Sequence, residues 1–134
     1  EKDTYFRKEL VFGRVHDESA ALMRGVSGNA GLFGNVTDVA KVWQMLLNRG
    51  VYDSIRFFKA ETIDLFTRVQ YPDTNNYRGL AFNKIQFEFD QEGSTYGSQA
   101  SPRSFGHTGF TGTMVWADPE NDLLFVFLSN RVHP

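Results

Sequence analysis

The sequence contains no cysteine, only four prolines and no long hydrophobic run. The absence of cysteine excludes disulfide bonds and thiolate metal sites, although it does not distinguish a reducing compartment from an oxidising one. No apolar stretch approaches the roughly 20 residues that a transmembrane helix needs. The sequence therefore predicts a globular domain without a membrane span.

An excess of basic charge is also missing. The 14 Lys and Arg residues against 16 Asp and Glu residues give a formal net charge of −2 and a pI near 5.9. Proteins that bind nucleic acid usually carry a basic patch that faces the phosphates, so a nucleic-acid partner is not expected. With 134 residues, 15% of them aromatic, the chain is long enough for one domain with its own core.

Hydrophobic periodicity and end signals predict two clear helices and a short third one. Thr37 is predicted to cap a helix whose apolar residues recur at helical spacing up to the stop signal at 48–50. A second helix is expected over 60–69. Asp17 can cap a short helix through 20–23, because its carboxylate can accept the free N–H groups of the first turn.

The predicted strands lie mainly near the C-terminus. Residues 114–118, the polar turn at 118–122 and the apolar run 123–128 are typical of two strands joined by a turn. Because 123–128 is uninterrupted by polar residues, it predicts a strand covered on both faces. Residues 90–102 are rich in Gly, Ser and Gln and predict a loop. Turns rather than crossover helices join neighbouring strands, so the predicted class is α+β, with an antiparallel sheet and packed helices.

One glycine-spaced stretch, residues 104–113 with the sequence SFGHTGFTGT, carries most of the functional information. Its three glycines recur at every third position, where they remove the Cβ and allow a tight turn or a close approach to a ligand. His107 and Thr108 stand between the first two of them. Spacing alone is equally consistent with a glycine-rich hairpin corner.

The order His107, Thr108, Gly109 at a predicted strand end, followed by a hairpin and by the residues 128–130, supports a more specific interpretation. It resembles the third signature box of the serine β-lactamases and penicillin-binding proteins. That box is usually Lys-Thr-Gly and accompanies a Ser-x-x-Lys box. Histidine in place of lysine is similar to the variant of some D-Ala-D-Ala carboxypeptidases and class C-related esterases.

Two further segments extend the resemblance in the same chain order. Residues 30–40, AGLFGNVTDVA, resemble the Ala-Gly-Leu-x-Ser-Thr-x-x-Asp-Leu-Ala phrase of class C-type serine hydrolases, which also precedes a helix. Residues 15–20, VHDESA, resemble an early segment of a subgroup found among bacterial cell-wall hydrolases. The resemblance therefore implies a partial β-lactamase/transpeptidase-like fold.

The resemblance also implies roles for five residues. The family takes one oxyanion donor from the backbone N–H of the residue after the third box, here Phe110, and His107 would serve the proton-transfer network or face the substrate carboxylate. The Thr108 hydroxyl and Asn130 would bind near that carboxylate. Gly109 would let the substrate lie alongside the strand as an added strand. The catalytic candidates are thus His107 and Phe110, the substrate-binding candidates are Thr108, Gly109 and Asn130, and no metal or cofactor is implied.

The nucleophile of the family is missing from this sequence. No serine is followed three positions later by lysine, so a Ser-x-x-Lys box is absent. The resemblance implies that residues 1–134 are the C-terminal portion of a β-lactamase-related domain, without its N-terminal Ser-x-x-Lys part and its C-terminal helix. We expect this segment alone to be inactive. Its expected partners are the missing half of the domain and a small-molecule or peptidoglycan-like substrate, in the periplasm or outside the cell.

Two other classes of protein stay open. A metal hydrolase could use the three histidines, but no pair of them has the His-x-x-x-His spacing on a helix that commonly binds zinc. A non-catalytic binding or interaction module of a cell-envelope protein is the stronger alternative, because the chain carries no nucleophile. Labelling of a longer parent protein by a fluorescent penicillin or a fluorophosphonate would separate an enzyme from such a module.

Overall fold

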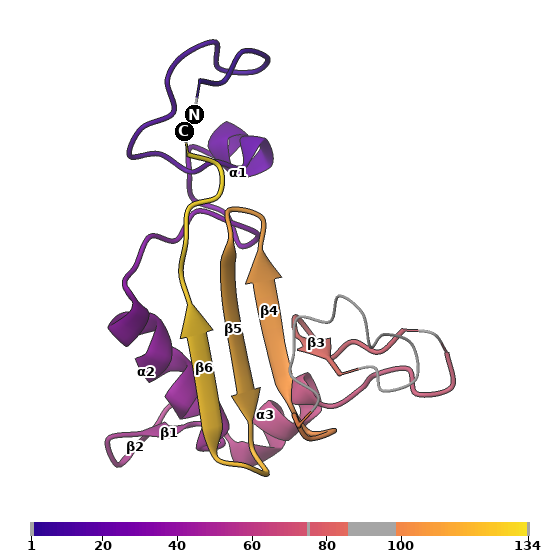
Figure 1. Ribbon diagram of the computed structural model, residues 1–134. Helices are drawn as coiled ribbons and strands as arrows, with labels where there is room; N and C mark the ends of the chain where they lie inside the picture. The colour runs from indigo at the N-terminus through magenta and orange to yellow at the C-terminus, as the bar shows by residue number, and fades with distance from the viewer. Residues whose placement is uncertain (1, 75, 86–98, 134) are drawn as a thin grey trace.

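The computed structural model describes residues 2–74, 76–85 and 99–133. An antiparallel sheet forms the body of the structure, and α2 lies against it (Figure 1). The predicted α+β class is confirmed. Both chain termini lie at the end of the sheet where β4 turns into β5. Of the loop predicted over 90–102, residues 90–98 lie outside the described residues.

Each predicted helix is present close to its predicted bounds, as α1 (Glu18–Leu22), α2 (Val36–Leu47) and α3 (Ala60–Thr67). The predicted cap of α1 is confirmed, since the Asp17 carboxylate accepts a hydrogen bond from the Ala20 N–H at 2.7 Å. The predicted cap of α2 is wrong by two residues. Asn35 rather than Thr37 is the cap of that helix, because its side-chain oxygen accepts the N–H of the first turn. No described helix has both the length and the apolar character needed to cross a membrane.

The strands of the described part form a short hairpin and a four-stranded antiparallel sheet, made of β1 (Val51–Tyr52), β2 (Ile55–Arg56), β3 (Asn83–Lys84), β4 (Phe105–Gly109), β5 (Thr113–Asp118) and β6 (Leu123–Phe127). β4 pairs with β5 along its whole length, from Phe105 opposite Ala117 to Gly109 opposite Thr113. On its other side β4 meets only β3, which reaches Phe105 and Gly106. The remaining edge of β4 therefore has no neighbouring strand within the described residues.

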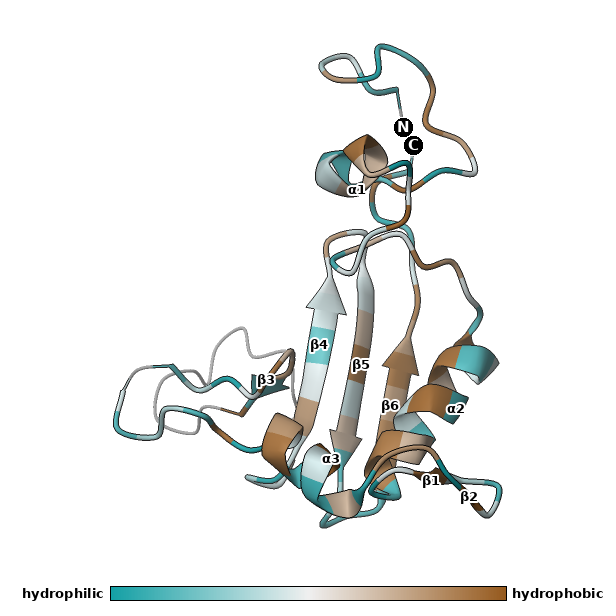
Figure 2. Cartoon of the chain, turned by 180° about the vertical axis from the view of Figure 1, so that it is seen from behind, coloured by the Kyte–Doolittle hydropathy of each residue, from teal (hydrophilic) through white to brown (hydrophobic). Residues whose placement is uncertain are grey.

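The core lies between α2 and one face of the sheet (Figure 2). Leu47 of α2 packs against Phe105 of β4 and Ala117 of β5. The rings of Trp43 and Phe82 contact the Phe105 ring, with centroids 5.8 and 5.2 Å away. Aromatic pairs at this separation stabilise a core beyond the area they bury. The first residue of β4 is thus anchored in the core.

The strand β6 has one partly covered face and one exposed face. Leu124 and Val126 are half-buried, whereas Leu123, Phe125 and Phe127 are 58%, 46% and 51% exposed. The prediction that this strand is covered on both faces is therefore wrong for the structure of this chain. An all-apolar strand shows that both faces avoid water, but it does not say which part of a protein covers each face.

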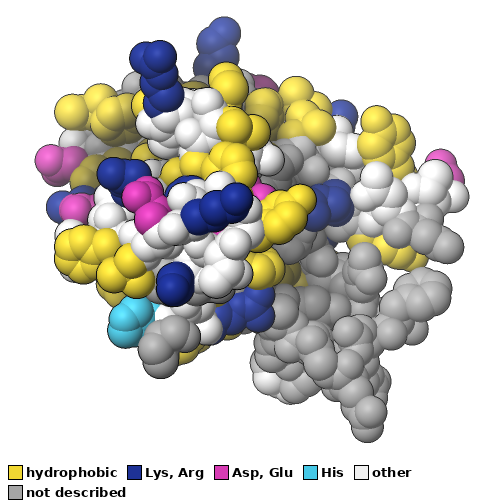
Figure 3. All heavy atoms as spheres, turned by 90° about the horizontal axis from the view of Figure 1, so that it is seen from above, with side chains coloured by type: hydrophobic (Ala, Val, Ile, Leu, Met, Phe, Trp, Pro, Cys, Tyr) yellow, Lys and Arg dark blue, Asp and Glu magenta, His cyan; other side chains and the backbone are white. Residues whose placement is uncertain are grey.

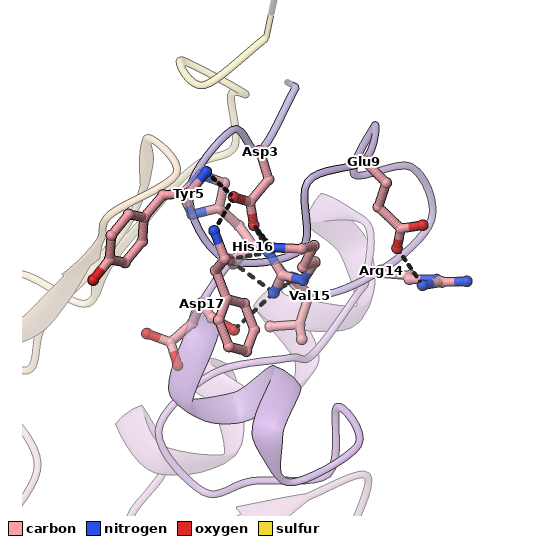
Figure 4. A network of polar contacts seen from close by, with 9 residues as sticks. Asp3, Tyr5, Glu9, Arg14, Val15, His16 and Asp17 are labelled. Carbon is pink, nitrogen blue, oxygen red and sulfur yellow. Dashed lines mark hydrogen bonds and ion pairs between the residues drawn. The ribbon is translucent and has the colours of Figure 1, made fainter.

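The N-terminal arm is organised around one arginine, Arg7. Its guanidinium donates hydrogen bonds to the carbonyls of Val15, His16 and Asp17 at 2.9 to 3.3 Å and pairs with Asp3 (Figure 4). A guanidinium has five N–H donors in a fixed plane, so it can join several carbonyls at once. These bonds hold the arm against the segment that precedes α1 and so define where His16 lies.

The end of the molecule that carries the termini exposes many hydrophobic side chains (Figure 3). Exposed hydrophobic residues of the segment 2–34, which lies at this end, include Tyr5, Phe12, Val26, Leu32 and Phe33. Large exposed apolar patches often mark interaction surfaces, whereas single exposed apolar residues are normal.

Candidate functional site

The stretch singled out in the sequence, 104–113, forms β4 and its turn into β5. Along β4 the burial decreases, since Phe105 and Gly106 are buried, Thr108 is half-buried and His107 is exposed. Gly106 lies directly against Trp116, where an added Cβ would stand 2.4 Å from the indole Cδ2. That glycine is therefore required by packing. The functional candidates lie on the exposed end of the same strand.

The His107 imidazole is oriented by two hydrogen-bond partners. Its Nδ1 lies 2.7 Å from the Thr108 carbonyl oxygen, and its Nε2 lies 3.3 Å from Nη2 of Arg78. A carbonyl oxygen can only accept and a guanidinium can only donate. The hydrogen bonds therefore require a neutral imidazole with its proton on Nδ1 and an accepting lone pair on Nε2.

Arg78 is a residue of this site that the sequence reasoning missed. It stands 29 positions before His107, and it belongs to no recognisable motif. It is held in place because its backbone carbonyl accepts from Gln70 and because it forms an isolated antiparallel bridge with Asn83, one residue of β3. The side chain of Arg78 is exposed and makes no ion pair within the described residues. It therefore places a positive charge beside the histidine.

The backbone N–H of Phe110 makes no hydrogen bond within the described residues. The turn that contains it is tight, since the N–H of Gly112 donates to the Gly109 carbonyl at 3.0 Å and Gly112 adopts a φ of +98°. Such a backbone conformation favours glycine. The turn thus presents, one residue beyond the His-Thr-Gly sequence, a donor that has no partner in the described part of the chain.

The five predicted site residues lie at one end of the sheet. His107, Thr108 and Gly109 end β4, and Phe110 opens the turn. Asn130 is exposed beside this turn, because the residues before and after it both bond to the turn. The side chain of Asn130 makes no hydrogen bond in the described part of the chain.

Other parts of the described chain offer no competing site of comparable chemistry. Within residues 2–74, 76–85 and 99–133 no group of three His, Asp or Glu side chains could hold a metal ion. A cavity of about 550 Å³ lies between the N-terminal arm and the segment around α1, and residues such as Phe6, Arg14 and Phe33 line it. None of its lining residues belongs to β4 or the turn, so it is separate from the candidate site.

In the described part of the chain, the site thus combines an antiparallel sheet, a strand edge without a neighbouring strand, a His-Thr-Gly strand end and a turn N–H without an acceptor. The chain belongs to the beta-lactamase family, whose model, described as Beta-lactamase, matches residues 4–134.

The chain is also similar to several curated proteins that share one name. The "Putative D-alanyl-D-alanine carboxypeptidase" of Escherichia coli (strain K12) is 41% identical over 128 residues, which cover 95% of this chain and 29% of that protein. Proteins of the same name from Escherichia coli O157:H7 and Salmonella agona (strain SL483) are 42% and 40% identical over the same shares. The chain thus spans less than a third of the length of these relatives.

Proposed function

We propose that this chain is the C-terminal portion of a β-lactamase-related serine hydrolase, and that the serine nucleophile stands in a part of the protein outside residues 1–134. The absence of a Ser-x-x-Lys box and the much greater length of the relatives support this division. The proposed reaction is acyl transfer or hydrolysis on a peptide, ester or β-lactam-like substrate. By analogy with the names of the relatives, a peptide that ends in D-Ala-D-Ala is the first substrate to test.

The observation that carries the proposal is the N–H of Phe110, directly after β4, which has no hydrogen-bond acceptor among the described residues. When a serine attacks an acyl carbonyl, negative charge develops on the carbonyl oxygen, and preorganised N–H donors stabilise it. The Phe110 N–H would be one such donor, and the N–H of the nucleophilic serine would be the other. Replacing the Phe110 side chain would leave this donor in place.

The open edge of β4 supports the proposed binding mode of the substrate. Residues 107–109 have no strand partner on the side of β3 within the described residues, so a substrate can lie there as an added strand. Gly109 would allow a close approach of the substrate backbone. The Thr108 hydroxyl and the Asn130 amide would hydrogen-bond to the substrate carboxylate.

The histidine and the arginine divide the remaining roles. His107 would join the proton-transfer network between the nucleophile and the leaving group. Its Nε2 has one in-plane lone pair, which Arg78 occupies in this structure, so a proton of the reacting groups would replace the Arg78 N–H there. Arg78 orients that imidazole by donating to Nε2.

The exposed apolar surfaces support the proposed partner, the missing half of the same domain. Leu123, Phe125 and Phe127 lie on one face of β6 and stay exposed. Burial of a large apolar side chain contributes about 1.5–3 kcal/mol, so a covering segment would gain substantially from this face. A location in the periplasm or outside the cell is proposed from the relatives' names alone.

The experiment uses the full-length protein that contains this chain, incubated separately with a fluorescent penicillin and a fluorophosphonate. We expect one serine to be labelled, outside residues 1–134 and followed three positions later by lysine, as read by peptide mapping. Replacing that serine by alanine should abolish labelling. The alternative, a non-catalytic binding module of a cell-envelope protein, predicts no labelled serine in the native protein, and that outcome would rule out the hydrolase.

A further inference from the structure

The turn between β4 and β5 is held by a second segment, residues 129–131. Three consecutive carbonyls of the turn accept hydrogen bonds from it. Arg131 donates from its Nε to the Phe110 carbonyl and from its backbone N–H to the Thr111 carbonyl, the latter at 2.9 Å. The Ser129 hydroxyl donates to the Gly112 carbonyl at 2.6 Å. Every peptide unit of the turn is therefore fixed through its oxygen.

Side-chain packing reinforces these bonds. The Arg131 guanidinium carbon lies 4.9 Å from the centroid of the Phe110 ring, and the His16 ring stacks on Phe110 at 5.4 Å with an interplanar angle of 27°. A guanidinium near an aromatic ring is attracted by the electrons of its face. Gly112 has a φ of +98°, which favours glycine, and an added Cβ would stand 2.5 Å from the Ser129 hydroxyl oxygen. Three distant segments thus meet at Phe110.

The contacts restrict the orientation of the Phe110 N–H. On one side of Phe110, Gly109 is held by its pairing with Thr113 in the sheet. On the other side, the Phe110 carbonyl is held by Arg131. The Phe110 N–H belongs to the same peptide unit as the Gly109 carbonyl, which accepts the Gly112 N–H at 3.0 Å, and Arg131 holds the peptide unit that follows. The N–H therefore has little freedom to rotate, although nothing in the described chain accepts its hydrogen. A donor fixed before the substrate arrives stabilises developing charge best.

We propose that Arg131 is a positioning residue, which holds the Phe110 N–H in the orientation needed to stabilise the oxyanion. The proposal rests on the proposed function, since it concerns the oxyanion donor of that hydrolase. In this proposal Arg131 acts through its contacts with the turn.

The test compares Arg131→Ala and Arg131→Lys with the unmodified full-length protein, using the fluorophosphonate as the probe. Lysine keeps a cation beside the Phe110 ring, but it lacks the planar Nε–H that bonds to the carbonyl. We expect the maximal labelling rate constant at saturating probe to fall about 10- to 100-fold in both variants, as for a misplaced oxyanion donor. The probe concentration at half-maximal rate should change less than about threefold, because binding of the probe does not depend on the developing charge.

The control is Arg68→Ala, which removes an exposed arginine next to α3, at the other end of the sheet from the turn (Figure 1). It should label at the unmodified rate. A labelling rate for Arg131→Ala equal to that of the control would overturn the proposal, and so would full recovery of the rate in Arg131→Lys. If the unmodified protein does not label at all, the proposed hydrolase activity is refuted. This outcome is distinguishable from a failure of the Arg131 proposal, in which the unmodified protein labels normally.

The thermal unfolding midpoint of each variant distinguishes a loss of folded structure from an effect on the orientation of the Phe110 N–H. If the Arg131 variants unfold, Ser129→Ala takes their place, since it removes only the bond to the Gly112 carbonyl. We expect that variant to label several-fold more slowly with its unfolding midpoint preserved. An unchanged labelling rate in Ser129→Ala would then overturn the proposal.

Discussion

Lys84 provides a quantitative test of the packing beneath the site. It stands opposite Phe105 in the β3–β4 pair and is only 7% exposed. Its ammonium donates a hydrogen bond to the Arg103 carbonyl at 2.9 Å. The pKa of Lys84 is lowered from its ordinary 10.5 to about 8, mainly by burial and also by the positive charge of Arg103, while the Asp118 carboxylate partly opposes both.

The sign of the effect on stability follows from these two pKa values. Between about pH 8 and 10.5 the unfolded chain keeps the Lys84 proton while the folded chain has lost it, so the unfolded state binds more protons and stability rises with pH. One pKa unit corresponds to about 1.4 kcal/mol. From pH 7 to pH 10, the gain from Lys84 is therefore on the order of 2 to 3 kcal/mol at most.

The perturbation is Lys84→Met, which keeps the length of the side chain and removes the titrating group. The assay is urea unfolding of the variant and the unmodified protein at pH 7 and pH 10. As the pH rises, the unmodified protein should gain free energy of unfolding relative to the variant, by an amount on the order of 2 to 3 kcal/mol at most. At pH 7 the unfolding free energies of the two proteins should differ less than at pH 10. The variant is relieved of the penalty of a buried charge, but it leaves the Arg103 carbonyl without its donor.

Lys59→Met is the matched control, because Lys59 is exposed and its side chain makes no hydrogen bond or ion pair in the described part of the chain. Its pH profile should follow that of the unmodified protein. An identical change in the unfolding free energy of Lys84→Met and the unmodified protein between pH 7 and pH 10 would refute the assignment of a buried, titrating lysine.

Three further predictions concern the sheet and the site. Gly106→Ala should destabilise the fold by about 1–3 kcal/mol in urea unfolding, because the new Cβ would collide with the Trp116 indole. The control Gly28→Ala, with open space around the new Cβ, should change stability by less than about 0.5 kcal/mol. Burial disfavours the charged form of Asp118, but hydrogen bonds, led by those from Ser101, outweigh it and hold the carboxyl pKa far below its ordinary 3.8. The unmodified protein should therefore lose stability as the pH falls below about 4, and Asp118→Asn should remove this loss in unfolding measurements. Arg78→Ala should slow fluorophosphonate labelling of the full-length protein about tenfold by releasing the His107 imidazole, and a rate equal to that of the unmodified protein would show that the contact has no role.

Local sequence patterns predicted the helices well and their exact starts less well. Asp17 was identified as a cap because a carboxylate just before a helical pattern satisfies the first free N–H groups. Asn35 and Thr37 are both good caps two residues apart, so the pattern could not choose between them.

The exposed face of β6 shows a different limit of sequence reasoning. The run 123–128 correctly predicted a strand, since only apolar residues occupy it. Hydrophobicity also predicted cover for both faces, but in this chain only one face receives it, from α2. The hydrophobicity of a strand reflects every surface that covers it in the folded protein. A contact with a covering segment is seen only when that segment is part of the structure.

The sequence by itself determined the chemistry available at the site, because His107, Thr108 and the glycine-spaced turn are adjacent in the chain and their motif is local. Only the tertiary structure decided that Arg78 would face the imidazole and that Arg131 would hold the turn. These contacts join residues 29 and 21 positions apart. They depend on strand register and on the path of the loops, which no local pattern encodes.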